Sequence, residues 1–186
     1  MAITKGVNAT AIDTDDPFEF LAPGNVGGNM HQSMDVRACA SGDLNNDADA
    51  VILAQVPSNA VITSIKIFND DLDTGSSSSV NVGVYNGNVQ FNDTDASATL
   101  YAADAVIDED CFAAAQTFLR SGSPQSPVDM AFAAAARKAN PLQKLWEVAG
   151  LTSDPGVPLR IAITQTATVS GAQAGDVLMV VQYVTD

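Results

Sequence analysis

Residues 53–85, LAQVPSNAVITSIKIFNDDLDTGSSSSVNVGVY, decide the fold. In Val80–Tyr85, a valine at every second position alternates with Asn, Gly or Tyr, which gives a strand one apolar face. The longer segment Ala60–Asn69 shows a similar alternation. Its residues predicted to share one face are Val61, Thr63, Ile65 and Ile67. Strands of this kind pack into a two-layered β-structure, and they carry little chemical reactivity.

Turn-forming residues separate the neighbouring strand candidates. The connections are Pro57–Asn59, the polar loop Asp70–Ser79, the hairpin turn Asn86–Asn88, Thr152–Pro158 and Gly171–Gly175. The further strands are Val51–Val56, Val89–Phe91, Leu159–Thr168 and Val177–Val184. The last of these is apolar on both faces, which predicts a central position in a sheet or contact with another subunit.

Two helices are predicted within the second half of the chain. Asp108 suits an N-cap, and Phe112, Ala115 and Leu119 follow at helical spacing before Gly122. The segment Asn140–Gly150 has stronger signals. Its markers are the N-cap Asn140, Pro141 at the first helical position, Gln143 in a capping-box pattern, the stripe Leu142, Leu145, Trp146 and Ala149, and the stop Gly150. Residues 130–136 fit either a helix or a short strand.

Together these elements predict a mainly β fold: an antiparallel β-sandwich of jelly-roll type with two short inserted helices. The expected organisation is an extended N-terminal arm with a first short strand over residues 1–50, and one β-domain over residues 51–186. Residues 1–35 look irregular but contain the apolar clusters Phe18–Leu21 and Met30–Met34. Either the arm docks on its own body or a neighbouring subunit, or it is a terminus that does not dock.

Composition excludes several classes of function. The 186 residues include 46% apolar residues, enough for one core, and the net charge is −14. Only eight Lys and Arg are spread along the chain, so direct binding of nucleic acid is not expected. No apolar run reaches the ~20 residues of a membrane span, and the N-terminus lacks the apolar core of a secretory signal. We therefore expect a protein that is made and used without export and does not contact membranes.

The candidate reactive residues are few. Cys39 and Cys111 are the only cysteines, and a cytosolic origin favours free buried thiols over a disulfide. His31, the only histidine, lies in GGNMHQS without a local partner for catalysis or metal binding. The segment Asp43–Asp49 places oxygen ligands as a calcium loop does. However, Ala48 stands where that loop needs Gly, and Ala54 where it needs an acid, so a solvated acidic turn is preferred over a weak calcium site.

Carboxylates and bases also cluster locally. Asp70, Asp71 and Asp73 share one loop, while Asp104, Asp108, Glu109 and Asp110 precede the first predicted helix. A glycosidase would need two such groups across a cleft and usually aromatic platforms, which this sequence does not indicate. Arg137, Lys138 and Lys144 form the one basic cluster, either solvated or paired with an acidic partner surface. The predicted set of catalytic, cofactor-binding and metal-binding residues is therefore empty, and no cofactor is expected.

Four segments in order carry a resemblance to a known group. These are VPSNAVITSIKIFNDDLDTGSSSSVNVGVYN, YAADAVIDEDCFAAAQTF, LQKLWEVAGLTSDPG and GDVLMVVQYVTD. Over residues 51–186 the chain resembles the capsid decoration (cement) proteins of tailed bacteriophages. The resemblance implies a jelly-roll-like virion structural protein without enzymatic activity. It also implies a homo-oligomer, most plausibly a homotrimer, bound to the major capsid protein on the outside of the head.

These expectations define the hypotheses to be tested. The first is a decoration protein that is synthesised in the host cytoplasm, stabilises the capsid lattice, and uses residues 1–50 and Val177–Val184 for intersubunit contact. The second is another phage component, such as a head fibre base, a neck or tail protein, or the major capsid protein itself. The third is a β-sandwich that binds host glycans, and an enzyme is the fourth.

Overall fold

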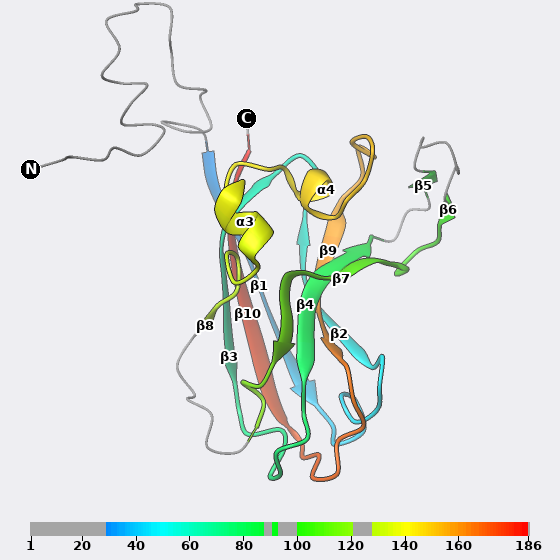
Figure 1. Cartoon of the computed structure of the whole chain (residues 1–186), viewed down its shortest axis with the longest axis vertical. Coiled ribbons are helices and arrows are strands. Elements are labelled where there is room, and N and C mark those ends of the chain that lie inside the picture. Colours follow the sequence, from blue (N-terminus) through cyan, green and yellow to red (C-terminus); the bar gives the residue numbers. More distant parts are fainter. Residues whose placement is uncertain (1–28, 88–90, 93–99, 121–127, 186) are drawn as a thin grey trace, which may run out of the picture.

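The computed structural model describes residues 29–87, 91–92, 100–120 and 128–185. Two four-stranded antiparallel sheets face each other (Figure 1). Sheet A has the order β1 (Asn29–Cys39), β10 (Gly175–Thr185), β3 (Val61–Asn69), β8 (Val128–Asp129). Sheet B has the order β2 (Ala50–Val56), β9 (Leu159–Gln165), β4 (Val80–Asn86), β7 (Val106–Gln116). The short strands β5 (Phe91–Asn92) and β6 (Leu100–Tyr101) pair with each other.

The chain alternates between the two sheets. Every connection from β1 to β4 crosses from one sheet to the other, and so does every connection from β7 to β10. The segment from β4 to β7 returns to the same sheet and includes the β5–β6 pair, which lies apart from the sandwich in Figure 1. The predicted mainly β, antiparallel two-sheet fold is therefore confirmed, and the crossing connections are consistent with the jelly-roll type.

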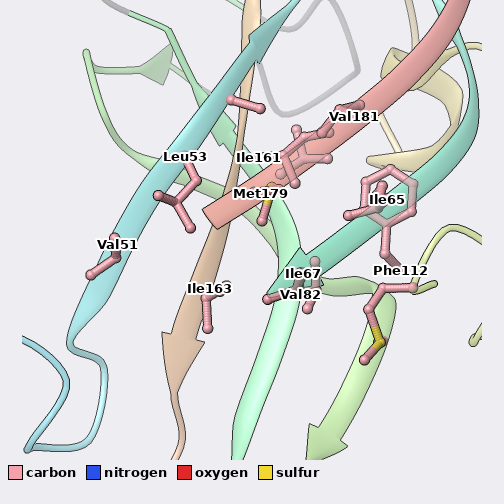
Figure 2. Close-up of a cluster of buried hydrophobic side chains, with 14 of the residues drawn as sticks. Val51, Leu53, Ile65, Ile67, Val82, Phe112, Ile161, Ile163, Met179 and Val181 are labelled. Atoms are coloured by element: carbon pink, nitrogen blue, oxygen red, sulfur yellow. The ribbon is translucent and has the colours of Figure 1, made fainter. Parts of the chain in front are cut away.

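The core lies between the sheets and consists of aliphatic side chains at alternate strand positions. Figure 2 shows side chains of both sheets meeting there, among them Ile65 and Met179 from sheet A and Ile161 and Val82 from sheet B. The valines of β4 and the isoleucines of β9 are fully buried, as the alternation predicts. Burial of each such side chain contributes about 1.5–3 kcal/mol to folding.

The residues predicted to share one face of β3 are wrong in the first half of the strand. The pairing of β3 with β10 shifts between Gln182 and Tyr183, so that Ile62 rather than Thr63 points into the core. The extra residue Thr63 donates its hydroxyl to the carbonyl of Gln182 at 3.1 Å. A bulge of this kind reverses the facing of all residues on one side of it, which alternation alone does not reveal.

The first predicted helix is wrong, because the residues after Asp108 belong to strand β7 of sheet B. The local signals, acids followed by alanines, favour a helix, but pairing with β4 overrides them. The ladder between β4 and β7 has three register irregularities, and Ala115 has a positive φ of 52°. Strand β7 therefore lacks a regular two-residue alternation. Gly122, the predicted end of the helix, lies outside the described residues.

The second predicted helix exists but is shorter and starts later. Two helices lie at one end of the sandwich, α3 (Ala135–Ala139) and α4 (Leu145–Val148) (Figure 1). Asn140 is the C-cap of α3, not the N-cap of α4. The amides of Leu145 and Trp146 donate to the carbonyls of Ala60 and Ser58, so the turn between β2 and β3 provides the contacts that position the start of α4. Gly150, with φ of 72°, ends the segment as predicted.

The predicted hairpin after β4 is also wrong in its partner. Asn86 is the last residue of β4, and its amide donates to Ala105, which leads into β7. Phe91 pairs with Tyr101 instead of with β4. The residues between Gly87 and Phe91 lie outside the described residues. Residues 1–28, which form more than half of the predicted arm of residues 1–50, lie outside them as well.

The prediction that residues 1–35 are irregular is wrong for the last residues of this segment. Asn29–Cys39 form strand β1, which pairs with β10 over its full length of 11 residues. The first strand is therefore a full member of sheet A rather than a short addition. The division into an arm of residues 1–50 and a domain of residues 51–186 stays a prediction.

Candidate interaction surface

Strand β1 presents its side chains in the opposite sense to the other long strands. Met30, Met34 and Val36 point away from the core and are 69%, 62% and 59% exposed. Polar side chains of β1, including His31 and Asp35, lie on the other face of the strand, which is directed toward the sandwich. An edge strand of an antiparallel sandwich normally places its apolar residues inward. The reversal in β1 leaves apolar side chains exposed on the outer face of sheet A.

The apolar side chains of β1 continue onto the two neighbouring strands. Residues directly opposite one another in an antiparallel pair lie on the same face of the sheet. Three rows of apolar residues therefore cross the outer face: Met30–Val184–Val61, Met34–Val180 and Val36–Leu178–Phe68. We call these residues the outer-face rows. Those of β3 and β10 are half-buried, so the rows form one surface with its most exposed part on β1.

The charge of this surface differs from that of the whole chain. The chain has 22 Asp and Glu and only 8 Lys and Arg. Between the first and last outer-face rows, the outward residues of β1, β10 and β3 include no acid and a single cation, Lys66, which stands opposite Asp129 of β8. Acids begin again beyond the rows, at Asp176 and Asp70. An apolar area nearly free of charge has a low desolvation cost, whereas the acidic remainder keeps copies apart in solution.

The doubly apolar strand Val177–Val184 lies where its pattern predicts. It forms most of β10, between β1 and β3, and therefore has a central position in sheet A. Val177, Met179 and Val181 are buried in the sandwich core. The alternate side chains Leu178 and Val180 belong to the outer-face rows and are half-buried. The core explains only one of the two apolar faces of this strand.

The histidine and the candidate calcium loop are held by structural contacts. His31 stacks on Tyr183 with ring centroids 5.4 Å apart. The carboxylate of Asp43 accepts from Arg37 at 3.1 Å and from the amide of Ala40, and the bond with Arg37 lowers the pKa of Asp43. Asp49 accepts from the amides of Asn45 and Asn46. Within the described residues, no three His, Cys, Asp or Glu side chains lie close enough together to hold a metal ion.

Ala48, which stands where a calcium loop has glycine, adopts a positive φ of 67°. The loop thus has the backbone turn of a calcium loop, but two of its carboxylates are used to close it. A solvated turn remains our interpretation of Asp43–Asp49.

The carboxylates of the loop after β3 are structural as well. Asp73 is fully buried and accepts from the amides of Gly75, Ser77 and Ser78 at 2.8–3.0 Å. Asp70 accepts from the amide of Asp176, which connects this loop to the start of β10. Hydrogen bonds to backbone amides replace the water that a buried carboxylate would lose. These hydrogen bonds of Asp73 and Asp70 hold the loop after β3 in place at one end of the sandwich.

The acids of the second cluster lie on and beside β7. Asp104 pairs with Arg160 of β9. Burial raises the pKa of Asp108, and the hydrogen bond from the amide of Asp110 opposes this shift. Asp108 and Asp110 are two residues apart in the strand, at the edge of sheet B. Their placement on one edge strand, rather than across a cleft, does not provide the pair that glycoside hydrolysis requires.

The predicted basic cluster is divided by the fold. Arg137 is 1% exposed, while Lys138 is exposed and Lys144 half-buried. The guanidinium of Arg137 lies 5.8 Å from the ring centroid of Phe112 and 5.4 Å from that of Phe132. It donates to the carbonyls of Ile62 and Asn140, both at 3.2 Å. Arg137 therefore joins α3 to both sheets and is not part of a surface patch.

Both cysteines are free, as predicted, and burial raises the pKa of each thiol. Cys39 ends β1 and is buried, and Cys111 lies within β7. The two thiols belong to different sheets. In the described part of the chain, no helix has the length and apolar content of a membrane-spanning segment.

The surface on β1 had a signal in the sequence that was missed. Met30, Met34 and Val36 lie at even-numbered positions and the polar residues His31, Ser33 and Asp35 at the odd ones between them, which is the period of a strand despite the polar Gln32. The turn formers that precede them led to an irregular assignment. Alternation alone also cannot show that the apolar side of a strand points outward.

Two solved structures have folds similar to this chain. A chain of the cyanophage Pam1 capsid asymmetric unit is 19% identical, with a TM-score of 0.55, covering 94% of this chain and 99% of that chain. A chain of the capsid of Ralstonia phage GP4 is 18% identical, with a TM-score of 0.52, covering 86% of each chain. No family model and no curated protein sequence matches the chain. At these identities the similarity shows the fold alone.

Proposed function

We propose that this chain is a structural protein of a bacteriophage virion, and specifically a decoration protein that binds the outer surface of the major capsid lattice. The observation that carries the proposal is the set of outer-face rows on sheet A, led by Met30, Met34 and Val36. Two phage capsid structures contain chains of this fold, which supports the same class of function. The mechanism is mechanical: each copy covers apolar area of the shell, and the contact is repeated by symmetry.

The contact face fits this role energetically. Covering apolar surface contributes roughly 25 cal/mol per Å², and the outer-face rows offer it without the desolvation of acids. Lys66, which lies between these rows, is exposed and stands opposite Asp129 of β8. The polar groups of the candidate loops are occupied in structural hydrogen bonds, which supports a role without catalysis. The proposed location is the exterior of the head, after synthesis in the host cytoplasm.

Self-association is part of the proposal. From the resemblance in sequence we expect a homotrimer, with residues 1–50 and β10 contributing to contacts between subunits. Light scattering after size exclusion tests this expectation, because a trimer has three times the 19.2 kDa mass of the chain. A free protein that is monomeric and remains so on the particle would contradict it.

The decisive experiment compares phage heads with and without the protein. Purified heads that lack it are incubated with the full chain and imaged by cryo-electron microscopy. Density on the outside of the lattice, in a copy number set by the capsid symmetry, supports the proposal. Density confined to the neck or tail, in about a dozen copies or fewer, would instead assign another structural role. Failure to associate with particles would overturn both.

A further inference from the structure

A groove lies between the free edges of the two sheets. Strand β1 is one edge strand of sheet A, and β2 is one edge strand of sheet B. Between them is a hollow of about 310 Å³ lined by Ser33–Asp35, Ile52–Gln55 and Arg160. A second hollow of about 280 Å³ adjoins it at Ile52 and is lined also by Arg37 and Asp43. The groove thus follows the free edge of β1, along residues 33–35, and Met34 of the outer-face rows borders it.

The walls of this groove are suited to an extended peptide. Each edge strand pairs on one side only among the described strands, β1 with β10 and β2 with β9. The other side of such a strand has backbone N–H and C=O groups that an added strand can bind. The half-buried Ile52 lines both hollows, Met34 borders one of them, and Arg160 and Arg37 place two of the chain's eight Lys and Arg at the groove.

We propose that this groove binds residues 15–21 of the same chain, DDPFEFL, as an added strand. In this segment Phe18 and Phe20 fall on one side and Glu19 on the other, the period of a strand. The phenylalanines can contact Ile52 and Met34, and Glu19 on the other side can approach Arg37 or Arg160, which now pair with Asp43 and Asp104. Asp35 and Asp43 also line the groove. The apolar cluster that the sequence predicts to dock thereby has a defined site. The inference concerns the isolated chain and does not rest on capsid binding.

The chain is long enough for this arrangement. Residues 1–28 lie outside the described residues and end where β1 begins at Asn29. From Leu21 to Asn29 the backbone spans at most about 26–29 Å. The groove begins four to six residues along β1, about 14–20 Å from Asn29. The connecting residues 22–28, APGNVGG, include Pro23 and three glycines, which favour a reversal of direction.

The arginines at the groove can pair with additional carboxylates. Arg37 pairs with Asp43 at 3.1 Å, and the side chain of Arg37 is 58% exposed. Arg160 pairs with Asp104, whose side chain is 56% exposed, and also donates to Gln55. Exposed ion pairs of this type contribute little, so a further carboxylate can share or replace either one at small cost.

Hydrogen exchange followed by mass spectrometry tests the proposal on the full-length protein. The test variant is F18S/F20S, and V7S/A11S is the matched control with two apolar residues removed upstream. We expect amides of residues 33–35 and 52–55 to exchange at least about tenfold faster in the test variant than in the control or the natural sequence. Amides of β4 and β9 report the integrity of the sandwich and should be unchanged.

Equal exchange at the groove in all three proteins would overturn the proposal. The same measurement at protein concentrations a hundredfold apart distinguishes the source of the strand. Protection that does not depend on concentration supports binding within one chain. Protection that increases with concentration, together with a larger mass by light scattering, would assign the strand to a second copy and overturn the intramolecular arrangement. Capsid binding of F18S/F20S is a separate readout, so the two proposals can fail independently.

Discussion

Met34 of β1 stands directly opposite Val180 of β10, and both side chains point away from the core of the sandwich. The pair shows how sheet A differs from sheet B. Both sheets contribute apolar side chains to the core, but sheet A also carries apolar side chains on its outer side. A substitution can therefore affect binding through the outer side or stability through the inner side. The predictions below separate these two effects.

The Met34→Asp substitution should weaken the proposed binding to phage heads while the fold is retained. Met34 is 62% exposed, so the free energy of unfolding should change by no more than about 0.5–1 kcal/mol. An unpaired carboxylate within an apolar contact should weaken binding at least about 30-fold, or about 2 kcal/mol. Co-sedimentation with heads measures the affinity. Ala174→Asp adds the same charge at an exposed turn and should bind normally; equal losses in the two variants would contradict the assigned surface.

The Arg137→Ala substitution should destabilise the protein by about 2–4 kcal/mol in urea denaturation. It removes a buried side chain that packs on Phe112 and donates to the carbonyl of Ile62. Arg137→Met keeps much of the packing and should lose less. Lys138→Ala, at the next and exposed position, is the control and should stay within about 0.5 kcal/mol. If R137A is as stable as K138A, the link between the helix and the sheets is unimportant.

The Gly83→Ala substitution should destabilise the protein by about 3 kcal/mol or more, or prevent folding. A Cβ at Gly83 would clash with the carbonyl oxygen of Asp108 and the carbonyl carbon of Glu109, which are backbone atoms of β7. At Gly42 a Cβ meets nothing within 4 Å, so Gly42→Ala should be neutral or slightly stabilising. Thermal unfolding of both variants measures the difference. Normal stability of G83A would show that β7 does not approach β4 so closely.

Asp108→Asn should stabilise the protein at pH 7 but not in acid. Burial raises the pKa of Asp108 above its usual 3.8, so the folded state binds its proton more tightly than the unfolded state does. The penalty of the charged form is therefore present above the folded pKa and disappears as the pH falls toward 3.8. Urea denaturation at pH 7 and at pH 4 measures it. Asp47→Asn, at an exposed position, controls for the change in net charge, and a stabilisation by D108N that persists unchanged in acid would contradict the mechanism.

The two thiols should resist modification in the folded protein. Burial raises the pKa of both Cys39 and Cys111, so little thiolate is present at pH 8. A chromogenic disulfide reagent should react slowly with the native protein and then titrate both thiols after denaturation in the absence of reductant. Recovery of no thiol under denaturing conditions would show that the two had been oxidised.

The sequence predicted the fold class well, because β3, β4, β9 and β10 have apolar residues at strand spacing between clear turns. It failed where pairing between distant residues overrides local preference. Asp108 and the alanines after it favour a helix, yet β7 is held by β4 through three register irregularities. The start of α4 depends on Ala60 and Ser58, about 85 residues away, which accept its first amides.

The candidate surface could be predicted only in part. The double apolarity of Val177–Val184 indicated a second contact for this strand, and the structure places it in the centre of sheet A. The alternation of β1 was visible, but its outward sense depends on the register with β10. Arg137 looked like a surface cation, since nothing near it in sequence indicates the two aromatic rings that cover it.

The pairing of β1 with β10 also determines when sheet A can exist. The ladder joins Asn29–Cys39 to Gly175–Thr185, so it cannot form until the ribosome has released nearly all the residues between Asn29 and Thr185. Until then Met30, Met34 and Val36 lack the neighbouring apolar side chains that β10 contributes to the same face. The complete apolar outer face of sheet A is therefore absent until β10 has been synthesised and has paired with β1.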